Sequence, residues 1–182
     1  MQPSEYITAF NGHHPIIAED AFVDISARLI GNVTIGSKAS VWPGAVLRAD
    51  DEQIAIGTGS AVLDLCLLEA PGGQPVVVES GALISHKACI HGAVVESGAL
   101  VGIGAIVLDG AVIGEGALIG AGALITPGTK VPEGMLMLGQ PAKAVRPLKA
   151  DEKQNMIDQL AELATKAEIY RHQLGLSRID RR

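Results

Sequence analysis

The sequence predicts a mainly β chain, a parallel β-helix of six-residue repeats followed by one C-terminal α-helix. Three observations support this fold class. Aliphatic residues recur every six positions over most of the chain, glycine is abundant at 22 of 182 residues, and aromatic residues make up only 3%. A core with so few aromatic side chains must be built from small, regular layers, and this length suffices for one domain with such a core.

The six-residue period is the strongest of these observations. An amphipathic helix repeats its apolar residues at three and four positions, and a half-buried strand repeats them at every second position. A period of six instead fits a short strand plus a turn, with one inward aliphatic residue per unit; three units complete one triangular coil. About nineteen such units predict roughly six stacked coils. The predicted inward residues are Val23, Leu29, Ile35, Val41, Leu47, Ile56, Val62, Leu68, Val78, Ile84, Ile90, Val95, Val101, Val107, Ile113, Ile119, Ile125, Val131 and Met137.

The regular spacing breaks at three places. The step is nine residues over 47–56, ten over 68–78 and five over 90–95. Insertions in a solenoid extrude as loops on one face, which is often the functional face. Residues 70–75, "APGGQP", are rich in glycine and proline and uncharged, so we expect either an ordered turn or a mobile flap.

The period changes near the C-terminus. Apolar residues over 149–175 alternate steps of four and three, which predicts one amphipathic helix that packs on the coils or on another subunit. The stripe consists of Met156, Leu160, Leu163, Ala167, Tyr170 and Leu174. The predicted organisation is therefore a β-helix domain with a short N-terminal extension over 1–148, the helix over 149–175 and a tail over 176–182.

Charge and composition exclude several classes of partner. A net charge of −6 argues against nucleic acid and anionic membranes. The chain has no apolar run long enough to span a bilayer, and its first ten residues lack the features of a signal peptide. Cys66 and Cys89 do not make a disulfide framework. We therefore expect a cytoplasmic protein with buried, reduced thiols.

Stacking the coils brings three polar residues into one column. Each of Arg48, Glu69 and His91 follows an inward aliphatic residue, so the three should line one outer face at roughly 4.8 Å per coil. His86 lies two residues after an inward residue and should point from a corner. It could not easily reach His91 of its own chain, but a symmetric neighbour could bring it there.

Five segments together resemble the γ-class carbonic anhydrases and their close relatives. They are "VWPGAVLRAD", "VLDLCLLEA", "SHKACIHG", "VGIGAIVLDGAVIGEGALIGAGALITPG" and "GQPAKAVRPL". The resemblance covers roughly residues 12–150 and the C-terminal helix. It implies a left-handed β-helix and a homotrimer with a metal ion at each subunit interface, held by two histidines of one chain and one of its neighbour. His86 and His91 match the second and third of these ligands. A spacing of five residues suits two ligands that serve two different subunit interfaces.

The chain departs from the family at the first metal ligand, where Glu69 replaces a histidine. Two imidazoles and one carboxylate can bind zinc with an open fourth position, and the same set suits ferrous iron, so Zn²⁺, Fe²⁺ or another divalent metal is the expected cofactor. An anionic ligand reduces the positive charge of the site and should acidify a bound water less. Alternatively, Glu69 serves only as the partner of Arg48 in the same column, which leaves no third ligand and predicts a metal-free chain.

Two further departures affect the surroundings of the metal. Ala61 and Leu63 stand where the family has Asn and Gln, so two polar groups are missing near the metal. The resemblance implies that the one replaced by Leu63 would have been a hydrogen-bond partner of the bound solvent. Asp64, Arg48 and Asp50 are retained, and the resemblance implies that they orient solvent. For Arg48 and Asp50, a structural role at the trimer interface is the favoured alternative.

Three functions are compatible with these features. The first is a γ-carbonic anhydrase-like metalloprotein that interconverts carbon dioxide and bicarbonate. The second is a hexapeptide-repeat acyltransferase that uses coenzyme A, and the third is a catalytically inactive trimeric scaffold, which the altered first ligand supports. His13, His14 and His172 lie outside the matched motif and are expected at the surface.

Overall fold

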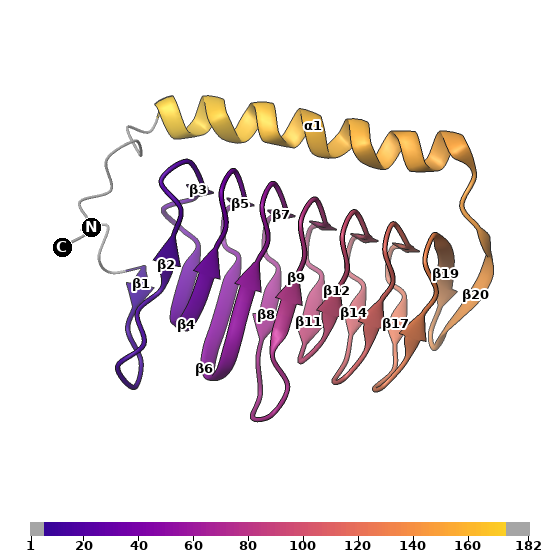
Figure 1. Ribbon diagram of the computed structural model, residues 1–182, viewed down its shortest axis with the longest axis horizontal. Coiled ribbons are helices and arrows are strands. Elements are labelled where there is room, and N and C mark those ends of the chain that lie inside the picture. Colours follow the sequence, from indigo (N-terminus) through magenta and orange to yellow (C-terminus); the bar gives the residue numbers. More distant parts are fainter. Residues whose placement is uncertain (1–5, 174–182) are drawn as a thin grey trace.

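The structure is a computed structural model that describes residues 6–173 (Figure 1). It confirms the predicted class: the described chain is mainly β, with parallel strands stacked as a solenoid and one helix at the C-terminal end. The elements are β1 (Ile7–Thr8), β2 (Ile16–Ile17), β3 (Phe22–Val23), β4 (Arg28–Ile35), β5 (Ser40–Val41), β6 (Val46–Ile56), β7 (Ala61–Val62), β8 (Leu67–Glu69), β9 (Val76–Val78), β10 (Leu83–Ile84), β11 (Cys89–His91), β12 (Val94–Val95), β13 (Leu100–Val101), β14 (Ile106–Val107), β15 (Val112–Ile113), β16 (Leu118–Ile119), β17 (Leu124–Ile125), β18 (Lys130–Val131), β19 (Met135–Gly139), β20 (Ala142–Pro147) and α1 (Ala150–Gln173).

The number of turns is slightly larger than predicted. One face stacks β3, β5, β7, β10, β13, β16 and β19 in that order, one strand per turn, so the solenoid has about seven turns. Ile17, which precedes the first predicted inward residue, is also buried and pairs with Ile35 of the next turn. All of the predicted inward aliphatic residues are buried, and together with small alanines they form one continuous core.

The longer spacing over residues 47–56 predicted an extruded loop, but the structure has none there. Strand β6 remains extended through these residues, pairing with β8 through residues 46–48 and with β9 through residues 54–56. Strand β4 runs alongside, so these two long strands replace a corner and join two faces into one sheet.

The ten-residue step does contain a loop, and this loop is an ordered turn. The backbone N–H of Gln74 donates to the carbonyl of Pro71 at 2.9 Å. The N–H of Gly73 donates to the Glu52 carboxylate at 3.1 Å, which ties the turn to β6. Of the two alternatives left open for residues 70–75, the turn is therefore the observed one.

Helix α1 runs back along the length of the solenoid (Figure 1). Its apolar stripe packs on outward-facing residues of the seven-strand face. This second cluster consists of Phe22, Trp42, Ala61, Leu63, Leu83, Leu100 and Ala167, with Leu118, Met156, Leu160 and Leu163 packed against it. Near the end of the helix, the ring of Tyr170 lies 5.7 Å from Trp42 and 5.9 Å from Phe22. The predicted last helical residues, 174 and 175, and the tail over 176–182 lie outside the described part of the chain.

An ion pair anchors the first turn of α1 to the preceding strand. Glu152 accepts two hydrogen bonds from Arg146, at 2.7 and 2.8 Å, and a third from the backbone N–H of Lys149 at 2.8 Å. The hydrogen bonds from Arg146, followed by that from Lys149, lower the pKa of Glu152 from 4.5 to about 2.

We expect acid to weaken the docking of α1. Because the pKa of Glu152 is depressed in the folded chain, its stabilising contribution is present above pH 4.5 and is lost as the pH falls towards 2. Fluorescence of Trp42, the single tryptophan, should report this change through its contact with Tyr170. Glu152→Gln should reduce the pH dependence over this range.

Glu162→Gln is the matched control, because the Glu162 carboxylate also has a lowered pKa but its ion pair, with Lys166, lies within the helix. It should keep the wild-type acid transition. An unchanged transition in Glu152→Gln would show that this anchor does not hold the helix.

The last turn of the solenoid is closed by a different kind of pairing. Strand β20 pairs antiparallel with β19, whereas the turns before it pair in parallel. The chain then leaves this end to enter α1 (Figure 1). No helix within residues 6–173 is both long enough and apolar enough to cross a membrane.

Candidate functional site

The predicted polar column is present on the outer face of β6, β8 and β11. Arg48 lies level with Glu69, and Glu69 lies level with His91, in adjacent turns. Each residue follows a fully buried leucine or isoleucine, so the alternation of the strand directs its side chain outward. All three side chains are partly exposed.

Glu69 faces two partners with the same oxygen. Its Oε1 accepts a hydrogen bond from the Arg48 guanidinium and lies 3.8 Å from Nε2 of His91. Arg48 also lies 3.4 Å from the Asp50 carboxylate. The ion pair between Glu69 and Arg48, one of the two alternatives, is therefore formed, and the carboxylate remains directed at the imidazole.

Asp109 joins this column from the next turn, and the sequence analysis missed it. Its Oδ1 contacts Nδ1 of His91. Strand register places Leu108 level with His91, so the period alone gave no reason to select Asp109. The available signal was Gly92, which lies in the short five-residue step and leaves room for the carboxylate.

His86 lies on a corner of the solenoid, as predicted. Equivalent positions in neighbouring turns, each two residues after an inward residue, are occupied by Asp64 and Ile103. Nδ1 of His86 lies 3.0 Å from the Asp64 carboxylate, and about half of the His86 side chain is exposed. Asp64 therefore contacts an imidazole, and no contact joins His86 to His91 among the described residues.

The candidate ligands of one chain do not make a complete metal site. Glu69 and His91 lie together, whereas His86 is separate on its corner. Within residues 6–173, no three His, Cys, Asp or Glu side chains converge closely enough to hold a metal ion.

Ala61 and Leu63 lie on the face of the solenoid that helix α1 covers. Both are buried, at 1% exposure, beneath helix α1 and beside Trp42. In the described chain, Leu63 is therefore covered by the helix. An apolar side chain at this position allows the helix to pack without burying an unpaired amide.

Of the two cysteines, which were both expected to be buried, only Cys66 is fully buried, and the three remaining histidines lie at the surface as predicted. Burial raises the pKa of the Cys66 thiol to about 12, and the thiol donates to the Ser85 carbonyl at 3.0 Å. Cys89 is half-buried; burial, followed by the nearby Glu69 charge, raises its pKa. Both thiols are free. The three histidines outside the motif, His13, His14 and His172, are exposed.

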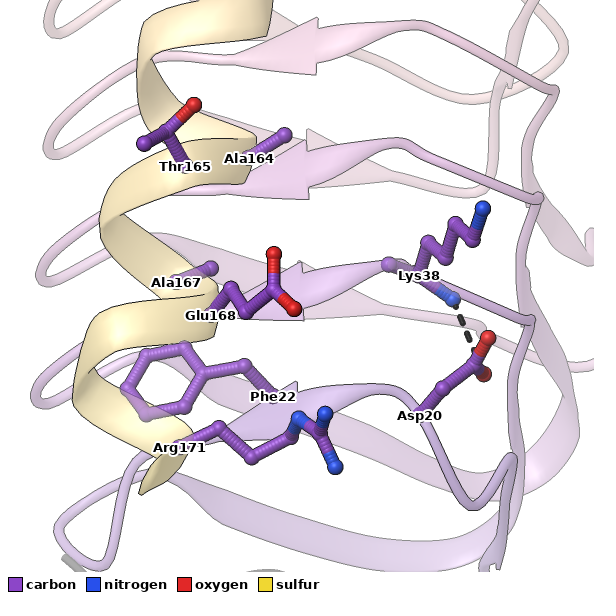
Figure 2. A pocket seen from close by; sticks show the side chains of 9 residues that line it. Asp20, Phe22, Lys38, Ala164, Thr165, Ala167, Glu168 and Arg171 are labelled. Carbon is purple, nitrogen blue, oxygen red and sulfur yellow. Dashed lines mark hydrogen bonds between the residues drawn. The ribbon is translucent and has the colours of Figure 1, made fainter. Parts of the chain in front are cut away.

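A separate cavity of about 280 Å³ lies between helix α1 and the first turns of the solenoid (Figure 2). Phe22 and Lys38 line it from the solenoid, and Glu168 and Arg171 from the helix. Asp20 at its edge is already hydrogen-bonded to the Ser37 hydroxyl and the Lys38 backbone, which lowers its pKa. None of the candidate site residues lines this cavity.

The fold and the paired outer-face residues define a hexapeptide-repeat protein, and comparison with known proteins agrees. Residues 92–127 match the family described as bacterial transferase hexapeptide (six repeats). The chain is 44% identical over 137 residues to a probable carbonic anhydrase of Methanocaldococcus jannaschii, covering 75% of this chain and 86% of that protein. It is 38% identical over 144 residues to mitochondrial gamma carbonic anhydrase 2 of Arabidopsis thaliana, covering 76% of this chain and 52% of the plant protein.

A solved structure is similarly close. A putative acetyltransferase from Bacillus cereus superposes with a TM-score of 0.91 at 34% identity, covering 92% of this chain and 97% of that chain. Together with the two relatives, this similarity extends over most of the described solenoid. The chain belongs to the γ-class carbonic anhydrase-like family of hexapeptide-repeat proteins.

Proposed function

We propose that the chain forms a cytoplasmic homotrimer with a divalent metal ion, zinc or ferrous iron, at each subunit interface, and that this site hydrates carbon dioxide reversibly. One observation carries the proposal. Glu69 and His91 face each other on one surface, while His86 projects from a separate corner. His86 could meet such a pair only if the pair belonged to another subunit.

The donor set fits a metal ion of this kind. Two ligands at about 2.1 Å from one tetrahedral ion lie about 3.4 Å from each other. The observed 3.8 Å between Glu69 Oε1 and His91 Nε2 is close to that value, so a small rotation would bring both atoms onto one ion. Two imidazoles and one carboxylate suit both zinc and ferrous iron.

When bound, such a metal lowers the pKa of a coordinated water towards neutrality, which supplies a nucleophile for carbon dioxide. The residues of this chain would limit that effect. Glu69 brings a negative charge to the site, and its Oε1 must be shared with Arg48. Asp64 orients His86, and Arg48 with Asp50 would orient solvent. We therefore expect weak activity.

Exposed apolar side chains support the trimer. Ile25, Leu65 and Ile103 lie on or next to the corner that carries His86, and Leu67 and Ile106 lie on the adjoining face; all five are exposed. Leu65 and Ile103 are more than half exposed, at 58% and 54%. Exposed apolar side chains gathered on one corner and its adjoining face favour a protein–protein interface there, and the position of His86 among them favours a second copy as the partner.

Light scattering should give a trimer mass of about 56 kDa from chains of 18.8 kDa. Replacing Leu65 and Ile103 together with glutamate should yield monomers with an unchanged circular dichroism spectrum, because both side chains are exposed in the isolated chain. The control is Ile157→Glu, an equally exposed apolar residue on the helix, which should remain trimeric. A wild-type monomer at micromolar concentration would exclude the shared site.

Metal analysis of protein purified without chelator, combined with a carbon dioxide hydration assay, tests the function itself. We expect about one metal ion per chain and activity that chelation abolishes. A stable trimer with neither metal nor activity would instead support the scaffold.

Acyl transfer from coenzyme A is the second candidate, favoured by the similarity to the solved protein described as a putative acetyltransferase. Titration with acetyl-coenzyme A distinguishes it, because a carbonic anhydrase has no reason to bind this compound. Micromolar binding together with no metal content would favour the transferase.

A further inference from the structure

We infer that Asp109 is a positioning residue that holds the proton of His91 on Nδ1 and so leaves Nε2 free to face Glu69. The metal-binding consequence rests on the proposed function. The hydrogen bond and its effect on the ring do not, because both belong to the metal-free chain.

The contact between Asp109 and His91 determines which nitrogen of the imidazole carries the proton. An ionised carboxylate can only accept hydrogen bonds, so the His91 nitrogen that contacts Asp109, Nδ1, must be the donor. In a neutral imidazole, the other nitrogen, Nε2, then carries a lone pair. Nε2 lies 3.8 Å from Oε1 of Glu69, and two acceptors at this separation are suited to a cation between them.

The fold provides the space for this contact through Gly92. A Cβ at this position would lie 2.9 Å from Oδ1 of Asp109 and 2.7 Å from Cβ of Gln74. The backbone of Gly92 also has a φ of +56°, which side-chain-bearing residues rarely adopt. Glycine therefore lets the Asp109 carboxylate reach His91 while the ordered turn over residues 70–75 packs against the same corner.

His86 shows the same arrangement with a different carboxylate. Its Nδ1 lies 3.0 Å from Asp64, so this ring is also held through Nδ1 and also presents Nε2. Histidines that bind metals generally donate their other ring N–H to a carboxylate, carbonyl or water, which orients the ring and makes the ligand more basic. Asp109 would act on His91 as Asp64 acts on His86.

The first measurement is the tautomer of His91 in the metal-free protein, read from the ¹⁵N shifts of its ring nitrogens and assigned with His91→Gln. We expect the Nδ1–H form in the wild type. Asp109→Leu, which removes the acceptor, should shift the ring towards Nε2–H. Asp109→Asn keeps an acceptor oxygen and should largely retain the wild-type form.

The second measurement is zinc affinity by competition with a chelator. Asp109→Leu should bind zinc about 10- to 100-fold more weakly than the wild type, with Asp109→Asn between them. Glu115→Ala is the control, because it removes the same negative charge as Asp109→Leu. Glu115 is exposed and contacts no imidazole among the described residues. Its tautomer and zinc affinity should equal those of the wild type.

The outcomes separate this inference from the proposed function. An unchanged tautomer and zinc affinity in a folded Asp109→Leu would overturn the role of Asp109 even if the wild type binds zinc. If the wild type binds no zinc, the proposed metal site is excluded. The tautomer shift in Asp109→Leu would still decide whether Asp109 positions His91. If Asp109→Leu does not fold, Asp109→Ala removes the acceptor without added bulk and serves in its place.

Discussion

Replacing Ile113 with aspartate should leave the chain unable to fold. Ile113 is completely buried and stacks between Val95 and Val131 of the neighbouring turns. An unpaired carboxylate in this position costs several kcal/mol, a large share of the roughly 5–15 kcal/mol that stabilises a folded domain. Ile119→Asp should have the same effect, because Ile119 occupies the equivalent inward position on the next face.

The matched control for this substitution is Val112→Asp, in the same two-residue strand. Val112 points outward and lies level with Lys130 of the next turn, so an aspartate there would be solvated and would gain a cationic neighbour. Soluble yield and thermal melting by circular dichroism should separate the two variants clearly. A soluble Ile113→Asp protein that melts at the wild-type temperature would show that the assigned inward positions are wrong.

Replacing Glu69 with histidine should raise carbon dioxide hydration by at least about tenfold, provided that the shared metal site exists. A neutral imidazole would increase the net positive charge around the metal ion, and a water bound there would lose its proton more readily. The substitution would also remove the competition between Arg48 and the metal for the same carboxylate oxygen.

Two further variants separate the two roles of Glu69. If Glu69 is a ligand, Glu69→Ala should sharply lower the metal content, and Arg48→Met should tighten metal binding because Oε1 is no longer shared. If Glu69 only pairs with Arg48, Glu69→Ala should leave the metal content unchanged. Equal metal stoichiometry in the wild type and Glu69→Ala would therefore exclude Glu69 as a ligand.

The fold and the polar column could be predicted because both follow from one spacing rule. Once Leu68 and Ile90 are placed inward in adjacent turns, the outward neighbours Glu69 and His91 must lie side by side. The corner position of His86 follows from the same count. These features depend on local periodicity, which a single sequence displays directly.

The remaining features could not be predicted because they depend on departures from that periodicity. Asp109 reaches His91 only because the turn at Gly92 is short and lacks a side chain. Leu63 could not be placed beneath α1 until the course of the helix across the solenoid was known. The extended path of β6 through the nine-residue step likewise depends on its pairing with β4.

The hairpin at the end of the solenoid has a consequence for the whole molecule. A stack of identical parallel turns ends in a strand edge that matches the edge of any other copy, so the repeat could in principle continue from molecule to molecule as a fibre. In this chain β20 occupies that edge in the opposite direction, and the next residues turn away into α1. This pairing therefore blocks extension of the solenoid at this end and leaves the sides, where the candidate ligands lie, for the proposed assembly.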